Sequence, residues 1–269
     1  SRIYLRNEGQ LIQGNGTTGN SGIGELSVYQ ETNVGPYQFN YWCSPVGSKT
    51  DNSINNLFGI SLLHDVVDIT SSTPATHISS SSFNGTSSPL NIEPYWIWKF
   101  VAANNYSEWF HVQGSTSINP GEGFTMKGTL GSGNAQRYDF RGKPNNGTIA
   151  VNVLNNQFTL VGNPYPSAID TVAYIHDPEN ASVISGTLYF WEQDISINSH
   201  NIQAYQGGYG TYTISSDGLV ETYVPATFNS YNSDGSINTS NGVLHQENDP
   251  GAISLLVKGS WLKVYQTVL

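Results

Sequence analysis

Short runs of alternating apolar and polar residues recur along the chain and predict β-strands separated by turns. Tyr95 to Val101 is the clearest predicted strand, and the aromatic run from Tyr37 to Val46 stops at Ser44-Pro45, because proline removes a ladder donor. Further strands are predicted over 108–113, 124–127, 148–153, 157–161, 187–192, 208–214, 221–224, 242–245 and 253–258. This spacing, with so little helix, predicts an all-β fold of the β-sandwich or jelly-roll type.

One short helix is predicted near 167–176. Ser167 is a suitable N-cap and Asp170 follows three residues later, as in an approximate capping box. Val172 belongs to an apolar stripe of helical period, and Pro178 is expected to lie just beyond the end of the helix.

The two halves of the chain resemble each other. Tyr41 to Val46 corresponds to Leu160 to Tyr165, Tyr95 to Lys99 corresponds to Leu188 to Glu192, and Asn119-Pro-Gly with Met126 to Gly128 corresponds to Asp249-Pro-Gly with Val257 to Gly259. The order is kept while the spacing varies, as expected when strands are shared and loops are not. This favours two pseudo-repeated lobes, and convergent strand and turn composition is the alternative.

The correspondence divides the chain into four parts. Residues 1–35 are predicted to be N-terminal strands that continue from a longer protein, 36–130 a first β lobe, 131–157 a bridging segment, and 158–269 a second β lobe. Within the bridge, Arg137, Asp139, Arg141 and Lys143 are expected to hold one half against the other.

The composition narrows the range of partners. Charged residues make up 11% of the chain and the formal net charge is −10, so clustered cations for nucleic acid or anionic membranes are missing. No apolar run approaches the ~20 residues that span a bilayer, and no membrane insertion is predicted. The single Cys43 forms no internal disulfide and is interpreted as a buried, inert thiol. The oligomeric state stays open.

Aromatic side chains are the main candidates for ligand binding. In the strand predicted from Tyr95 onward, Trp96 and Trp98 share one face. Exposed, spaced rings suit a polysaccharide or cell-surface glycan because the C–H faces of sugars stack on them, whereas burial in a core is the alternative. The full candidate set is Trp96, Trp98, Trp109, Trp191, His200, Tyr205 and Tyr209. The last three lie in a segment ending in Gly-Gly-Tyr-Gly, which permits close backbone approach or forms a loop.

Catalysis is the weaker hypothesis. Glu122 and Glu192 are the alternative catalytic residues, since a glycosidase needs two carboxylates ~5 Å or ~6.5–9.5 Å apart. No local sequence signature marks them as such a pair. A lyase would draw on His111, Gln113, His200, Tyr205 and Tyr209.

One segment carries a weak signal for calcium. Asn232, Asp234, Ser236 and Asn238 place oxygen ligands at alternate positions around a glycine, but Val243 stands where an EF-hand has its glutamate. A plain Asp-Gly turn is favoured. No other cofactor is predicted, because the histidines are scattered and lack zinc-ligand spacing.

Several motifs resemble a known module. They are Asn40 to Gly47, Gly121 to Gly128, Tyr138 to Gly147, Gly162 to Asp170, and Phe190 to Gln193. Together they resemble a conserved module of large secreted flavobacterial (Bacteroidetes) proteins that carry a C-terminal type IX secretion sorting domain. The resemblance runs from about Ile3 to Phe228. It implies export and an extracellular or outer-membrane-surface location, and it brings no catalytic residues. Asp249 to Lys258 departs from the family's Pro-x-Gly-Gln-Gly-Phe pattern.

Three functions are therefore expected in order of preference. The first is a non-catalytic module of an exported bacterial protein that binds polysaccharide or acts as an adhesin. The second is an endo-acting polysaccharide hydrolase or lyase on the same scaffold. The third is a structural spacer beside a secretion sorting signal, which predicts no exposed aromatic patch.

Overall fold

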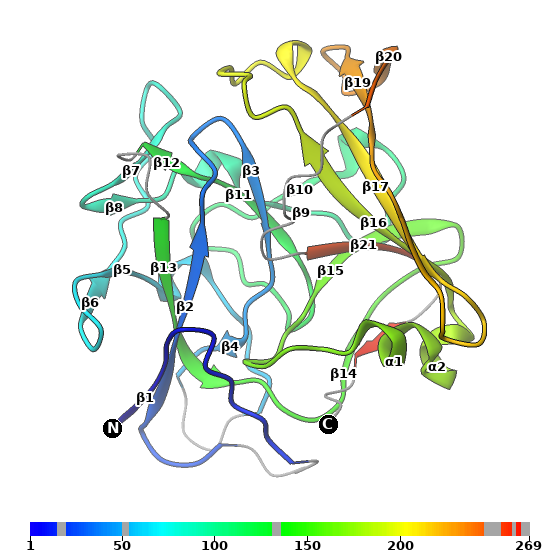
Figure 1. Cartoon of the computed structure of the whole chain (residues 1–269). Coiled ribbons are helices and arrows are strands. Elements are labelled where there is room, and N and C mark those ends of the chain that lie inside the picture. Colours follow the sequence, from blue (N-terminus) through cyan, green and yellow to red (C-terminus); the bar gives the residue numbers. More distant parts are fainter. Residues whose placement is uncertain (15–19, 50–53, 131–135, 245–253, 260–261, 265–269) are drawn as a thin grey trace.

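The computed structural model describes residues 1–14, 20–49, 54–130, 136–244, 254–259 and 262–264. Strands account for 42% of the chain and helix for 10%, which confirms the predicted all-β class (Figure 1). The short 3-10 helices are η1 (Ile60–Leu62), η2 (Pro94–Trp96), η3 (Tyr106–Glu108) and η4 (Ile202–Ala204).

The first lobe contains two principal sheets. One has the order β1 (Arg2–Leu5), β2 (Glu25–Thr32), β13 (Gln136–Pro144), β5 (Leu63–Val66) and β6 (Ser72–Pro74), with β4 (Val46–Gly47) also paired to β13. The other has the order β10 (Phe110–His111), β9 (Trp98–Lys99), β11 (Phe124–Lys127) and β3 (Phe39–Trp42). A small third sheet contains β12 (Thr129–Leu130), β7 (Gly85–Ser87) and β8 (Leu90–Asn91).

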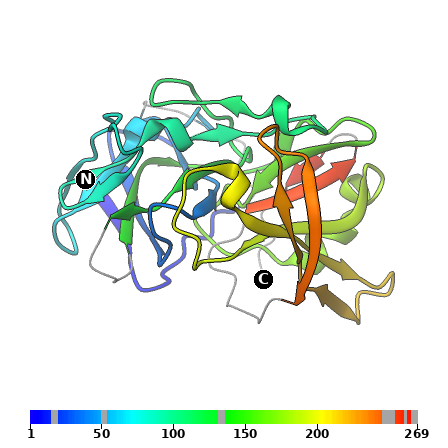
Figure 2. The same cartoon turned by 90° about the horizontal axis from the view of Figure 1, so that it is seen from above.

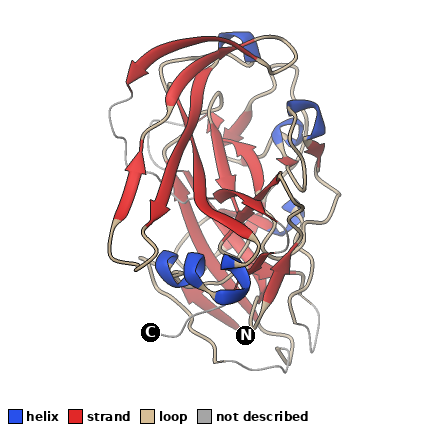
Figure 3. Cartoon of the chain, turned by 90° about the vertical axis from the view of Figure 1, so that its right-hand side faces the viewer, coloured by secondary structure: helices blue, strands red, loops and turns tan. Residues whose placement is uncertain are grey.

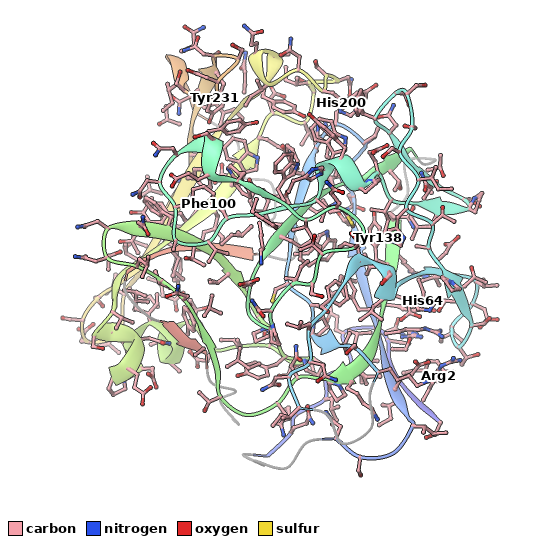
Figure 4. The ribbon with its side chains drawn as sticks, turned by 180° about the vertical axis from the view of Figure 1, so that it is seen from behind. Arg2, His64, Phe100, Tyr138, His200 and Tyr231 are labelled. Carbon is pink, nitrogen blue, oxygen red and sulfur yellow. The ribbon has the colours of Figure 1, made fainter. Side chains whose placement is uncertain are left out.

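The core of this lobe lies between the two principal sheets. Tyr138 and Phe140 of β13 meet Trp42 of β3, with ring centroids 5.9 and 5.8 Å from that of Trp42. Figure 4 shows Tyr138 on its strand within the first lobe. Phe124 and Met126 add the inward side of β11. Burial of these side chains, at roughly 25 cal/mol per Å² of apolar surface, is the main force that joins the layers.

The second lobe is built on one large sheet. Its order is β15 (Gln157–Gly162), β21 (Ser254–Gly259), β16 (Ile184–Gln193), β17 (Gln206–Ile214), β19 (Thr227–Tyr231) and β20 (Ile237–Leu244), with β18 (Glu221–Val224) also paired to β17. Separately, β14 (Ile149–Val151) pairs with β22 (Leu262–Val264). The helices α1 (Thr171–His176) and α2 (Pro178–Ala181) lie together at one end of the strands (Figure 3). Tyr174 and Ile175 of α1 join Leu188 of β16 in the core.

The predicted single helix is two helices, and its predicted N-cap is wrong. Asp170, not Ser167, caps α1, and its side chain accepts a hydrogen bond from the Ala173 amide at 2.9 Å. Asp177 ends α1 and caps α2, since its carboxylate accepts from the first amides of the second helix. The three-residue offset arises because an N-cap must accept from an amide two or three positions later, and Asp170 fills that role.

The two lobes share a strand order. The sequence β3-β11-β9-β10 across the first-lobe sheet matches β15-β21-β16-β17 across the second. The register between the first two strands of each sheet agrees as well. Trp42, Tyr41 and Phe39 pair with Phe124, Thr125 and Lys127, and Val161, Leu160 and Phe158 pair with Leu255, Leu256 and Lys258. These are the same pairs of positions that correspond in the sequence. The internal similarity therefore extends from sequence motifs to sheet topology.

The predicted bridge over 131–157 has a different role within its described part. Gln136–Pro144 is β13, which pairs with β2 along seven residue pairs inside the first lobe. Arg141 donates to Asp139 at 2.7 Å, and Lys143 donates to the Gly22 carbonyl. Arg137 pairs with Glu31 of β2. The charged residues of this segment therefore hold the first lobe together rather than joining the lobes, because strand pairing fixes their neighbours.

The lobes meet through β15 and a small core. The Leu160 amide donates to the Phe100 carbonyl at 2.7 Å, and the Gly123 amide donates to the Leu160 carbonyl at 2.8 Å. Phe100, Ala103 and Leu160 form the buried centre of this contact. Above it, a loop of the second lobe crosses to the first (Figure 2). The side-chain amide of Gln38 in the first lobe donates to two backbone carbonyls of that loop, both at 3.2 Å.

Candidate functional site

The predicted strand from Tyr95 to Val101 is interrupted. Pro94–Trp96 forms η2 and only Trp98–Lys99 is strand. Pro94 occupies the first turn and the Glu93 carboxylate accepts from the Tyr95 amide at 3.2 Å, so the chain begins a helical turn there. Trp96 and Trp98 therefore do not share a regular strand face, and the prediction that they do is wrong.

This turn exposes a different aromatic pair. Phe83 and Tyr95 are each 43% exposed, and their ring centroids lie 5.1 Å apart. Phe83 has a φ of 56°, in the left-handed region that a bulky residue rarely adopts and that costs of order 1–3 kcal/mol. Its amide donates to the Ser80 carbonyl and its carbonyl accepts from Trp96 Nε1 at 2.8 Å. The surrounding contacts thus hold an exposed ring in a strained position.

Half-buried rings support the exposed pair from beneath. Trp98 stacks on His111 at 4.2 Å with an interplanar angle of 17°, and its Nε1 donates to the Tyr95 carbonyl at 2.7 Å. Trp96 lies edge-on to Tyr95 at 4.7 Å. We call the set Phe83, Tyr95, Trp96 and Trp98 the ring platform.

A buried amine lies behind the ring platform. Lys127 at the end of β11 is 4% exposed, and its Nζ lies 3.7 Å from the centroid of Trp96. The rings of Phe39 and Tyr205 stand 4.8 Å away. Nζ donates to His200 Nδ1 at 3.0 Å and to the Tyr205 hydroxyl. We call Lys127 with these four partners the amine cage.

His200 brings the second lobe into the site. It lies in the loop 194–205, which follows β16, and Figure 4 shows it at the same end of the molecule as Tyr231. Its ring stacks on Trp96 at 4.9 Å with an interplanar angle of 23°. Because Nδ1 accepts from Lys127, Nε2 carries the proton and donates to Asn84 Oδ1 at 2.8 Å. One imidazole therefore connects the amine cage to the turn that carries Phe83.

Burial changes the ionisation of this cluster. It lowers the pKa of Lys127 to about 7, since no carboxylate forms an ion pair with this amine among the described residues. Burial, followed by the charge of Lys127, lowers the pKa of His200 to about 4. Burial also raises the pKa of Tyr205. At neutral pH the cluster holds an uncharged imidazole beside an amine that is half protonated.

The remaining predicted aromatics lie in other contacts. Trp109 packs on Phe100 at 4.9 Å near the lobe contact. Trp191 lies edge-on to Tyr209 at 5.1 Å in the second lobe. Tyr209 is 38% exposed, yet burial of its hydroxyl raises its pKa, against a hydrogen bond with Tyr41 that acts in the opposite direction. The structure therefore joins Trp96, His200 and Tyr205 in one cluster and separates them from the Trp191 pair.

The Gly-Gly-Tyr-Gly segment is strand rather than loop. It belongs to β17, and a Cβ on Gly207 would lie 2.7 Å from the Trp191 ring and 2.6 Å from the Glu192 carbonyl. A Cβ on Gly210 would meet the Tyr223 hydroxyl and the Glu192 carboxylate. The close approach that these glycines permit is made by the protein's own side chains.

The two alternative catalytic carboxylates have separate partners. Glu122 is 8% exposed, pairs with Lys99 at 2.9 Å and accepts from Asn119. Glu192 accepts from the Tyr223 hydroxyl. The lyase set divides in the same way, because His200 and Tyr205 contact Lys127 while His111 stacks on Trp98. Gln113 is exposed and Tyr209 pairs with Trp191.

The calcium candidate forms an Asp-Gly turn. Asp234 Oδ1 accepts from the amide and hydroxyl of Ser236, and Asn232 Nδ2 donates to the Ser236 hydroxyl. Gly235 has a φ of 81°, and a Cβ there would lie 2.1 Å from Tyr106 Cγ. Asn238 is exposed. Within the described ranges, no three His, Cys, Asp or Glu side chains gather as a metal site.

Cys43 is unreactive in this setting. Burial raises the pKa of its thiol to about 12, so almost no thiolate forms at neutral pH. This agrees with its interpretation as an inert thiol.

Lys127, Phe83 and Asn84 were missed by reasoning from the sequence. The only signal was a lysine at the end of the predicted strand Phe124–Lys127. All four residues of this strand are buried, so both of its faces are covered. Nothing local indicated that His200, 73 residues away, would meet it.

The fold and the site together define an all-β protein of two related lobes with an aromatic surface where the lobes meet. Residues 67–256 match a family described as a domain of unknown function, DUF8693, and the chain belongs to that family. No curated protein and no solved structure matches the chain. In the part of the chain that the structure describes, no helix is long and apolar enough to cross a membrane.

Proposed function

We propose that the protein is a non-catalytic glycan-binding module of an exported bacterial protein, and that the ring platform binds the glycan. The observation that carries the proposal is the pair of exposed rings, Phe83 and Tyr95, side by side on a strained and hydrogen-bonded turn. Strain of this kind persists where the surrounding structure enforces it, and it concentrates at functional sites.

The surroundings of the platform suit a sugar. Asn91 and Ser80 are hydrogen-bonded in the connection beside it, and the carboxylate of Glu93, which accepts from the Tyr95 amide, is 4% exposed. A pyranose ring offers an apolar C–H face for stacking and hydroxyl groups for neutral polar partners. A net charge of −10 disfavours strongly anionic polymers, and the resemblance to secreted modules favours a cell-surface or extracellular polysaccharide.

The alternatives receive less support. A spacer needs no exposed aromatic patch, whereas Phe83 and Tyr95 are each 43% exposed and lie side by side. A hydrolase needs two facing carboxylates, and Glu122 and Glu192 are engaged with different partners.

Binding to a panel of uncharged and acidic polysaccharides, by affinity electrophoresis and calorimetry, tests the proposal. We expect Tyr95→Ala and Phe83→Asn each to weaken binding at least tenfold, or about 1.4 kcal/mol. Asparagine tolerates the left-handed conformation, so the second variant removes the ring and keeps the turn.

Phe110→Ala is the matched control. Phe110 is 54% exposed, but it neighbours His111 in β10 and so points to the opposite face. It is expected to leave affinity unchanged. Absence of binding across the panel, or equal binding by all four proteins, contradicts the proposal, and release of reducing ends supports the hydrolase.

A further inference from the structure

The loop 194–205 attaches to the first lobe through polar contacts and through stacked rings. Its Ile195 and Ile197 carbonyls accept from Gln38 Nε2 at 3.2 Å, and the Tyr205 hydroxyl donates to the Tyr37 carbonyl at 3.3 Å. His200 forms hydrogen bonds with Lys127 and with Asn84 at the binding surface and stacks on Trp96. We call this segment the latch loop.

Asn84 links the latch loop to the ring platform. Ser80 Oγ accepts from the Asn84 amide and donates to its carbonyl, both at 3.0 Å, which closes the turn that contains Phe83. The His200 ring also packs against Phe83, with centroids 6.5 Å apart. The position of the exposed Phe83 ring therefore depends on contacts from the other lobe.

We propose that His200 and Lys127 form an acid-sensitive latch between the lobes: when both are protonated, the latch loop detaches and the ring platform loses its geometry. The step from platform geometry to glycan release rests on the proposed function; the opening of the loop does not.

The hydrogen-bond pattern explains why protonation opens the latch loop. The closed latch needs His200 Nδ1 as an acceptor, and a protonated imidazole has only donors. Two cations would then lie 3.0 Å apart in a site without a paired carboxylate. The aromatic rings of Trp96 and Phe39 offset the charge of Lys127 in part, through cation–π attraction, but offer nothing to the imidazolium hydrogen.

The other ionisable groups around the latch do not reverse the effect of protonation on the latch loop. Those facing it are Glu93 at the cap of η2, Tyr95 within η2, Tyr37 before β3, Tyr205 in the latch loop and Tyr106 of η3. Burial raises the pKa of Tyr205 and of Tyr106, so neither adds a charge as the pH falls. Glu93 favours the protonated imidazole, yet it accepts from the amides of Ser80 and Tyr95 and forms no ion pair with His200.

Both pKa values lie below the ordinary ones, so the open state binds protons more readily and acid favours opening. The closed-state pKa of Lys127 is about 7 against an ordinary 10.5. By linkage this alone raises the open fraction about tenfold between pH 8 and pH 5. His200, with a closed-state pKa of about 4, adds to the effect as pH falls from 6.5 toward 4.

Hydrogen–deuterium exchange of peptides covering 194–205 and 80–84, corrected for intrinsic rates at pH 8 and pH 5, tests the latch in the whole chain. We expect protection of both segments to fall at least tenfold at pH 5. His200→Gln accepts from Lys127 without gaining a charge, and it should reduce the pH dependence severalfold. Lys127→Met should reduce it as well.

His64→Gln is the matched control. Burial also lowers the pKa of His64, but it lies in β5, where Nδ1 bonds to the Leu62 carbonyl. It should retain the full pH dependence of the latch loop. Equal protection at pH 8 and pH 5, or an unchanged response in His200→Gln, overturns the latch. Loop opening without binding to any polysaccharide leaves the latch standing and removes the proposed function instead.

Discussion

Each of the two sheets with a common strand order carries a cross-strand aromatic pair between its third and fourth strands. In the first lobe Trp98 pairs with His111, and in the second Trp191 pairs with Tyr209. Trp98 and Trp191 are the residues that correspond in the sequence. The first pair stacks at 17°, whereas the second meets at 63°.

The strands around these pairs explain the difference. In the second lobe β16 and β17 are ten and nine residues long, and Gly207 lets the Trp191 ring approach the backbone of β17 closely. In the first lobe β9 and β10 have two residues each, and Pro94 starts a helical turn before β9. Trp98 and His111 are both half-buried, and Tyr209 of the second pair is 38% exposed. The exposed rings of the first-lobe site, Phe83 and Tyr95, come instead from the turns beside the interrupted strand.

Adding a methyl group at Gly207 breaks the second-lobe arrangement and has the largest expected effect. Gly207→Ala should destabilise the protein by about 2–4 kcal/mol, because the new Cβ meets both a backbone carbonyl and the Trp191 ring. Chemical denaturation measures the loss. Gly14→Ala, where nothing lies within 4 Å, should change stability little. Equal stability of the two variants would contradict the close packing of the Trp191 ring of β16 against Gly207 of β17.

Replacing the buried Lys127 tests how strongly burial disfavours its charge at the first-lobe site. Lys127→Met should stabilise the protein by about 1–3 kcal/mol at pH 7, because a desolvated amine without an ion pair is replaced by an apolar chain of similar length. The folded-state pKa of about 7 lies below the unfolded value of 10.5, so wild-type stability rises with pH across that window. The advantage of the variant should therefore shrink toward pH 10.

Lys99→Met is the control for that substitution. Lys99 pairs with the buried Glu122 at 2.9 Å, so its loss should destabilise the protein, by about 1–3 kcal/mol. Thermal unfolding from pH 6 to pH 10 compares the two variants. Destabilisation by Lys127→Met at pH 7 would mean that the amine cage favours the cation more than burial disfavours it.

The smallest expected effect concerns the turn that packs under Tyr106. Asp234→Ala removes the acceptor for the amide and hydroxyl of Ser236 and should lower Tm by about 2 °C. Because that carboxylate oxygen is already used within the turn, millimolar calcium should leave the Tm of both proteins unchanged. A calcium-dependent rise in wild-type Tm that is lost in the variant would restore the calcium interpretation.

Much of the architecture follows from local patterns. Period-two alternation and turn residues predict the all-β class, and the ordered motifs predict the sheet correspondence that the pairing of Tyr41 with Thr125 and of Leu160 with Leu256 displays. The start of the short helix was harder to predict, because Ser167 and Asp170 are equally good caps in the sequence. Only the fold around α1 selects Asp170. The bridge was placed wrongly, since the sequence of β13 does not say which strands it will join.

What the sequence determined by itself was the class of fold, and it also pointed to four residues that the structure brings into the candidate site, Trp96, Trp98, His200 and Tyr205. The tertiary structure alone decided which rings are exposed, because exposure depends on whether a strand continues or turns at Pro94 and on what another segment places above it. It also decided the chemistry of Lys127. A lysine has an ordinary pKa until the fold removes its water, and the groups that do so here come from segments up to 88 residues away in the chain, as Phe39 and Lys127 show.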